Sequence, residues 1–276
     1  MSGRDTRLRD RFAFVTVLLL AGMSFGWSSG AAREQPTLTV AAAADLTIAF
    51  EEIGKRFEDE TGVRIDFMFG STGQITQQIQ AGAPVDVFAA ASVSYIDQLR
   101  EQGLILEDTQ ALYARGQIVI WARSDSDIVI TSLDQLTDDA IERVAIANPD
   151  HAPYGAAARD ALISAGVWEQ IQDKLILGEN ISDTLRYGTT GNVDVAIVAL
   201  SLAIPSDGQW TIVPQEHYPP IDQALAVIAE TDHEEEARAF ALFVNSEAGR
   251  EIMREFGFLL PGESFASATP VASPSA

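Results

Sequence analysis

Residues 38–50 read LTVAAAADLTIAF, and the fold prediction starts from this stretch. Its first three residues predict a short buried strand. From Asp45 onward, apolar side chains recur at helical spacing as far as Phe57, which predicts an amphipathic helix that Asp45 opens. Four alanines, residues 41–44, separate the strand from the helix. A helix N-terminus presents free N–H groups and a partial positive charge, and small residues let another group come close. The stretch therefore predicts a cradle for an anion.

Three later turns share this character. The second turn is GSTG at 70–73, which contains two hydroxyls. The third is NPDHAPYG at 148–155, which has a proline near a helix start and the phenol of Tyr154. The fourth is ENIS at 179–182, in which Asn180 is a candidate helix cap. Each turn taken alone is explained by ordinary turn chemistry. Their joint occurrence between strands and helices, in both halves of the chain, favours an anion-binding function.

Strand and helix patterns alternate along the body of the chain. The predicted strands are 38–40, 63–69, 85–88, 118–121, 144–147, 194–200 and 224–229. The predicted helices begin at Asp45 and then cover 72–81, 92–103, 154–165, 181–187, 234–245 and 247–256. This alternation predicts an α/β fold with mixed, mostly parallel sheets. Because there are more units than one small sheet needs, we expect two lobes with a ligand cleft lined by strand-to-helix turns.

The lobes and the two chain ends follow from the same patterns. We expect crossings between lobes at 118–122 and 224–229, so that one lobe comprises 36–117 and 224–262 and the other comprises 118–223. Residues 1–32 are typical of a secretory signal, with a basic start, a short apolar stretch and small residues that predict cleavage near Ala31 or Ala32. An uncleaved membrane anchor is disfavoured by the shortness of the apolar stretch. Residues 263–276 are rich in Ser, Ala and Pro and predict a disordered tail.

The composition narrows the classes of function. The chain has no cysteine, which excludes disulfides and thiolate metal sites. A formal net charge of −22 argues against nucleic acid as a partner. The histidines, His151, His217 and His233, are not paired at metal-ligand spacing, and no GxSxG, HExxH or Walker A motif occurs. We therefore expect no enzymatic activity, no cofactor and no cation site.

Over residues 37–261 the sequence resembles the molybdate/tungstate-binding proteins of ABC importers, a branch of the type II periplasmic binding proteins. The resemblance is carried by VAAAADL at 40–46, FGSTG at 69–73, QIQAGAPVDVFAAA at 78–91, ANPDHAPYG at 147–155, LGENIS at 177–182, DVAIVALSLA at 194–203 and EFGFLLP at 255–261. It implies a periplasmic, monomeric, two-lobed receptor. Such a receptor holds a tetrahedral dianion with neutral donors and delivers it to a membrane permease.

Carried over position by position, the resemblance implies a ligand-binding set of Ala44, Asp45, Ser71, Thr72, Tyr154 and Ile181. Many relatives have Ser or Asn at the position of Asp45, and a carboxylate facing a dianion is repulsive by about 1 to several kcal/mol at contact range. We therefore expect the Asp45 side chain to cap its own helix, so that only its N–H faces the ligand. Some relatives have a ligand-binding Tyr at the position of Ala199, and we expect the Tyr154 phenol to replace it.

Rival functions are left open. Phosphate carries a proton at neutral pH and favours an acceptor such as Asp45, and sulfate is smaller than molybdate. A ferric-ion receptor on the same fold needs clustered tyrosines, for which Tyr154 and Tyr187 are the candidate pair. Hydroxymethylbilane synthase, an enzyme of similar architecture, attaches its cofactor to a cysteine, which this chain lacks. The alternative of another class is a secreted structural protein without a ligand.

Overall fold

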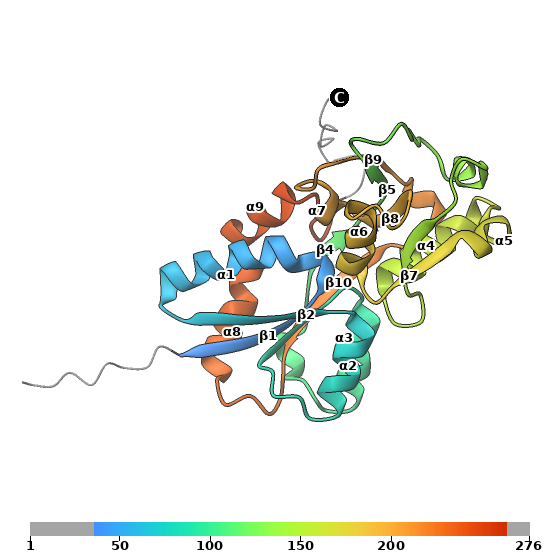
Figure 1. Cartoon of the computed structure of the whole chain (residues 1–276). Helices are drawn as coiled ribbons and strands as arrows, with labels where there is room; N and C mark the ends of the chain where they lie inside the picture. The colour runs from blue at the N-terminus through green and yellow to red at the C-terminus, as the bar shows by residue number, and fades with distance from the viewer. Residues whose placement is uncertain (1–35, 264–276) are drawn as a thin grey trace, which may run out of the picture. The chain divides into compact units, whose positions relative to one another are not determined.

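The computed structural model describes residues 36–263, so the predicted signal segment and residues 264–276 of the predicted tail lie outside it. Within this range the strands form two five-stranded mixed sheets with helices packed against both (Figure 1). The predicted α/β fold with two mixed sheets is thereby confirmed. None of the helices in the described range is long and apolar enough to cross a bilayer.

The first sheet has the strand order β2-β1-β3-β10-β4. β1 pairs parallel with β2 and β3, whereas β10 runs antiparallel between β3 and β4. The strands are β1 (Thr37–Ala43), β2 (Arg64–Gly70), β3 (Val87–Ala90), β4 (Ala111–Gly116) and β10 (Ile221–Val227). Successive side chains of a strand point to opposite faces. Val40 and Ala42 therefore enter one apolar core and Ala41 the other.

The second sheet repeats this arrangement with the strand order β7-β6-β8-β5-β9. β6 pairs parallel with β7 and β8, and β5 runs antiparallel between β8 and β9. The strands are β5 (Ile118–Arg123), β6 (Val144–Ala147), β7 (Leu175–Gly178), β8 (Val195–Ala199) and β9 (Gly208–Ile212). Every residue of β6 and β8 is buried, which explains their nearly continuous apolar sequence.

Helices cover both sheets. In the first half α1 packs with α8 and α9, and α2 packs with α3; in the second half α4 and α6 pack on the strands (Figure 1). The helices are α1 (Thr47–Thr61), α2 (Thr72–Gln80), α3 (Val93–Glu101), α4 (Pro153–Ser164), α5 (Trp168–Ile171), α6 (Ile181–Thr189), α7 (Leu200–Ala203), α8 (Glu234–Val244) and α9 (Glu247–Glu255). Short 3₁₀ turns cover Ala44–Leu46, Glu107–Thr109, Leu133–Thr137, Gln172–Lys174 and Gln215–His217.

The chain passes between the two sheets twice. Gln117 alone separates β4 from β5, and residues 213–220 lead from β9 back to β10. The stretches predicted as crossings are strands that belong to one sheet each, β5 to the second and β10 to the first. β10 also begins at Ile221, before the predicted start at Ala224. The lobe boundaries stay a prediction, which these sheet memberships support.

Several elements differ from the prediction for local reasons. α1 begins at Thr47 rather than Asp45, because Ala44–Leu46 form a 3₁₀ turn first. β4, β7 and β9 were not predicted: polar residues interrupt the apolar pattern of β4 and β9, and in β7, Leu177 is 49 % exposed. Glu263, assigned to the predicted tail, accepts the backbone N–H of Leu260 at 2.9 Å.

Candidate functional site

A small cavity lies where the turns that follow β1, β2, β6 and β7 meet. All six residues of the predicted ligand-binding set line it: Ala44, Asp45, Ser71, Thr72, Tyr154 and Ile181. None of the six is more than 4 % exposed. The cavity measures about 10 Å³, which is roughly the space that one water molecule needs. Turns from both sheets therefore meet around one buried point.

Helix N-termini surround this cavity. The first residues of α2, α4 and α6 all line it, and the first N–H groups of a helix have no acceptor within the helix. In α4, Pro153 takes the first position, so the N–H of Tyr154 is the first one available. At α6 the side chain of Asn180 accepts the N–H of Asp183 at 2.9 Å, which confirms the predicted cap. Three helix dipoles thus direct partial positive charge towards the same place.

The two hydroxyls of the second turn have different partners. Thr72 Oγ1 accepts the N–H of Ala91 at 3.1 Å, and none of the residues in the described range accepts its hydrogen. Ser71 Oγ donates to the backbone oxygen of His151 at 2.7 Å and lies 2.8 Å from Nδ1 of the same residue. The Thr72 hydroxyl is therefore available to a ligand, whereas the Ser71 hydroxyl is used to join the two halves.

Further hydrogen bonds hold the halves together around the cavity. The N–H of Gly73 donates to His151 O at 2.9 Å, and Ser182 Oγ donates to Ala44 O at 2.9 Å. Ser201 Oγ donates to the backbone oxygen of Asp45 at 2.8 Å. A Cβ on Gly73 would lie 2.8 Å from His151 O, so this approach requires glycine. The structure is therefore a closed arrangement of the two halves.

The predicted role of the Asp45 side chain is wrong. Its carboxyl caps no helix: Oδ2 accepts from the Tyr154 hydroxyl at 2.9 Å and from Gln223 Nε2 at 2.7 Å. The other oxygen, Oδ1, is buried and has no hydrogen-bond partner within residues 36–263. Two side-chain donors at one buried oxygen offset part of the cost of removing that oxygen from water.

The Tyr154 phenol also has a different partner from the one predicted. It donates to Asp45 and accepts from Gln223 Nε2 at 3.0 Å, so it has no second hydrogen for a ligand. Gly116 makes room for it, because a Cβ there would lie 2.0 Å from the phenol oxygen. Tyr154 can thus donate a hydrogen bond to a ligand through its backbone N–H. Tyr187, its predicted partner in a ferric site, does not line the cavity.

A buried network fixes these side chains. The Tyr113 hydroxyl donates to Gln223 Oε1 at 2.8 Å, which orients the amide so that Nε2 donates towards Asp45 and Tyr154. Burial raises the pKa of Asp45 to about 6, although hydrogen bonds from Gln223, Tyr154 and its own backbone oppose the rise. Burial also raises the pKa of Tyr113 and Tyr154 well above the usual value, with the Asp45 charge adding to it. Both phenols therefore stay neutral.

Sequence reasoning missed Gln223, Ser182 and Ser201. Gln223 lies on β10 and is 0 % exposed. The one sequence feature that could have indicated it is an amide side chain within the mostly apolar stretch IDQALAV. Ser182 and Ser201 carried no signal, because a serine at a helix start is more often a local cap. His151, noted in the sequence only as unpaired at metal-ligand spacing, contacts Ser71 through its ring and its backbone oxygen.

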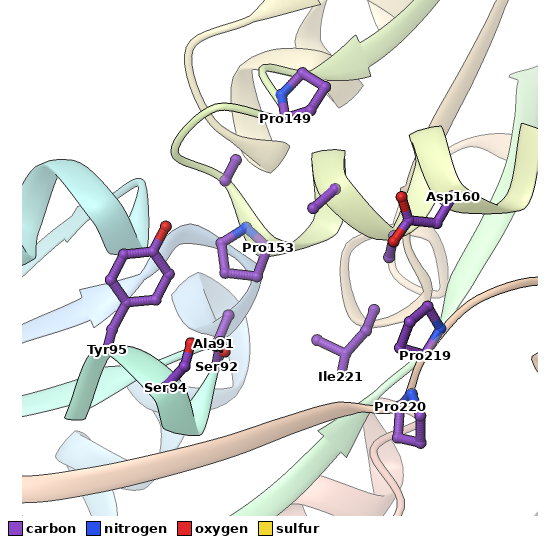
Figure 2. A pocket seen from close by; sticks show the side chains of 13 residues that line it. Ala91, Ser92, Ser94, Tyr95, Pro149, Pro153, Asp160, Pro219, Pro220 and Ile221 are labelled. Atoms are coloured by element: carbon purple, nitrogen blue, oxygen red, sulfur yellow. Dashed lines mark hydrogen bonds between the residues drawn. The ribbon is translucent and has the colours of Figure 1, made fainter. Parts of the chain in front are cut away.

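A larger hollow of about 270 Å³ adjoins the cavity and shares Ala91, Ala152 and Pro153 with it. Figure 2 shows Tyr95 and Asp160 on opposite sides of this hollow, and Pro219 along a third. Both halves of the structure contribute to its lining, so its width depends on how closely the halves approach each other.

No group of three or more His, Asp or Glu residues that could hold a metal ion occurs in the described part of the chain. None of the residues lining the small cavity is Lys, Arg or His. The donors at the cavity are backbone N–H groups and the Thr72 hydroxyl, which bind oxygen atoms of an anion rather than a cation.

Comparisons with known proteins agree on one family. A model of the family described as bacterial extracellular solute-binding protein matches residues 38–259. The molybdate-binding protein ModA of Rhodobacter capsulatus is 35% identical over 221 residues, which cover 79% of this chain and 86% of that protein. The solved structure of the Azotobacter vinelandii periplasmic molybdate-binding protein is similar with a TM-score of 0.78 and 26% identity, covering 81% of this chain and 99% of that one. The sulfate-binding protein SubI of Mycobacterium tuberculosis, with a TM-score of 0.70 and 16% identity over 83% of this chain and 88% of its own, shares the fold.

Proposed function

Because this chain belongs to the family of bacterial extracellular solute-binding proteins, whose relatives here include molybdate-binding proteins, we propose that it captures molybdate and delivers it to an ABC permease. We propose tungstate as a second ligand, since the two ions are nearly equal in size and charge. One observation carries the proposal: four turns from two sheets bring three helix N-termini and a free hydroxyl to a single buried cavity.

The proposed ligand contacts come from neutral groups. The backbone N–H groups of Ala44, Thr72, Tyr154 and Ile181 would donate to the four oxygens of the ion, and the Thr72 hydroxyl would add a further bond. Helix dipoles supply the positive potential that the cavity lacks in side chains. Ser71 would contribute through its backbone and by holding His151 in place.

The closed cavity also indicates how the ligand enters. Because the residues that line the cavity are almost all buried and come from both halves, we propose that the halves separate to admit a tetrahedral oxyanion and close on it. Gln117 and residues 213–220, which connect the sheets, are the proposed hinge. The bonds from Gly73, Ser71 and Ser182 across the cavity would then form on closure.

Members of this family are extracellular solute-binding proteins, which act as a component of transport systems. We propose in addition that the mature chain is periplasmic, is a monomer, binds no cofactor or nucleic acid and catalyses no reaction. The predicted cleavage near Ala31 or Ala32 is part of this proposal. Mass spectrometry of the exported protein tests the cleavage, and light scattering tests the monomer.

Isothermal titration of the mature protein with molybdate, tungstate, sulfate and phosphate tests the function. We expect tight binding of molybdate and tungstate and weak binding of sulfate and phosphate. Phosphate is the second candidate, because Asp45 Oδ1 has no partner and an ionised carboxyl there could accept the proton of hydrogen phosphate. Tight binding of phosphate alone would replace the proposed ligand, and no heat with any ion would favour a structural role.

A further inference from the structure

We propose that Asp45 binds the oxyanion as a neutral carboxylic acid that donates a hydrogen bond, so that capture of a dianion takes up one proton. The inference rests on the proposed function of the cavity. Asp45 then attracts the oxyanion instead of repelling it or capping a helix, and the affinity for the ligand depends on pH.

The hydrogen bonds around the carboxyl are one-sided. Both side-chain donors, Tyr154 and Gln223, reach the same oxygen, Oδ2, at 2.9 and 2.7 Å. Asp45 is 1 % exposed and lines the cavity, yet Oδ1 has no partner within the described range. A buried carboxylate with one bare oxygen is unfavourable, because both oxygens lose water and only one regains donors.

Protonation of Oδ1 resolves this imbalance. Oδ2 would keep its two donors, and Oδ1 would carry a hydrogen that needs an acceptor. An oxygen atom of a bound oxyanion is such an acceptor, since molybdate has no hydrogen of its own at neutral pH. The ionised form would instead place a negative charge beside the dianion.

Burial outweighs the hydrogen bonds from Gln223 and Tyr154 that favour ionised Asp45, and among residues 36–263 no positively charged side chain lines the cavity. Tyr154 on α4 and Tyr113 on β4 face the carboxyl, Tyr218 before β10 faces Tyr154, and burial raises the pKa of all three phenols. On α6, Asp183 and Arg186 pair with each other at a more exposed place. α7 carries no charged residue. Among the other titratable groups nearby, His151 contacts Ser71, Glu179 pairs with Gln74, and Asp160 lines the adjoining hollow.

Proton balance sets the expected pH dependence. The carboxylate, one proton from solvent and the dianion combine into a carboxylic acid hydrogen-bonded to the bound dianion, and no covalent bond of the oxyanion changes. In the ligand-free protein the pKa of Asp45 is about 6. Well below that pH the carboxyl is already protonated, so ligand binding takes up almost no proton. Well above it, each bound ligand takes up one proton. Linkage then weakens binding by close to tenfold for each pH unit above about 7.

Titration calorimetry of the mature protein with micromolar molybdate, from pH 5.5 to 8.5, tests the inference. Repeating each titration in two buffers of different ionisation enthalpy counts the protons directly. We expect close to one proton taken up at pH 8 and a dissociation constant that rises about tenfold per unit at the alkaline end. The substitution Asp45→Asn should abolish the uptake and flatten the profile, because its Nδ2 donates at every pH.

Two further variants sharpen the test. Asp86→Asn alters another buried carboxyl, which bonds Thr39, Thr231 and His233 away from the cavity, and should keep the wild-type slope. Tyr154→Phe removes a donor that favours the ionised Asp45, and should move the onset of proton uptake to higher pH.

The outcomes separate this inference from the proposed function. Tight molybdate binding with no proton uptake and a flat profile would overturn the role of Asp45 and leave the function standing. A slope that persists in Asp45→Asn would mean that another group takes up the proton, and would also overturn it. Absence of molybdate binding at every pH would overturn both, and phosphate binding that Asp45→Asn abolishes would make the carboxyl an acceptor.

Discussion

The buried carboxyl of Asp45 predicts a pH-dependent stability that can be measured without any ligand. The pKa of this group is about 6 in the folded protein against 3.8 for the ordinary value, because burial disfavours the charge. The folded state therefore binds more protons than the unfolded state between these two pH values. Stability from this group is fully present below about pH 4 and is lost as pH rises to about 6.

The magnitude follows from the size of the shift. A rise from 3.8 to about 6 corresponds to about 3 kcal/mol of unfolding free energy at roughly 1.4 kcal/mol per unit. Asp45→Asn removes the charge and keeps an oxygen for Tyr154 and Gln223. At pH 7.5 the variant should thus be more stable than the wild type by about 3 kcal/mol, which is roughly 6–12 °C in Tm for a body of this size.

Thermal and denaturant unfolding of ligand-free wild type and Asp45→Asn, at pH 4, 5, 6 and 7.5, provides the assay. The difference between the two proteins should be small at pH 4 and should grow to its full value by pH 7. Taking the difference cancels the opposite contributions of Asp183 and Glu263, whose pKa values are lowered by their partners. A difference that does not change from pH 4 to 7.5, or a variant less stable at pH 7.5, would refute the assignment of a buried charge.

The remaining predictions concern ligand binding. Gly73→Ala should weaken molybdate binding by about 1–3 kcal/mol, because the added Cβ would lie 2.8 Å from His151 O in the closed arrangement. Calorimetry measures the affinity, and circular dichroism checks that the ligand-free variant is folded. Thr72→Val should cost about 1.5–3 kcal/mol of binding, the value of a hydrogen bond to a charged group, and an unchanged Kd would exclude this hydroxyl from the site. Ser182→Ala removes one bond across the cavity and should raise the dissociation rate about fivefold in stopped flow, corresponding to about 1 kcal/mol.

The turns at the cavity could be predicted from sequence because their signals are local. Each strand-to-helix turn is specified within a few residues: by alanines before a helix, by GSTG, by a proline at a helix start, or by Asn180. Parallel strands bring such turns to one edge of each sheet, and all six predicted residues line the cavity where the turns of the two sheets meet. Their role in ligand binding stays a prediction.

The side-chain partners of Asp45 could not be predicted in this way. Tyr154 is 109 residues away in sequence and Gln223 is 178 residues away, and the choice between them and the helix start depends on how the two halves meet. The same holds for Gly116, whose missing side chain makes room for Tyr154. β4 and β9 were not predicted, because polar residues interrupt their apolar pattern and their pairing partners lie far away in the sequence.

The double crossing between the sheets has a consequence for the order of folding. The second sheet uses one continuous segment, from β5 to β9, and every strand it needs has been synthesised by Ile212. The first sheet needs β10 between β3 and β4, so β4 has no partner until the last strand emerges. Contacts between distant segments form slowly because a long loop must close first. The first sheet therefore cannot be completed before β10 is available, whereas the second sheet needs no segment beyond Ile212.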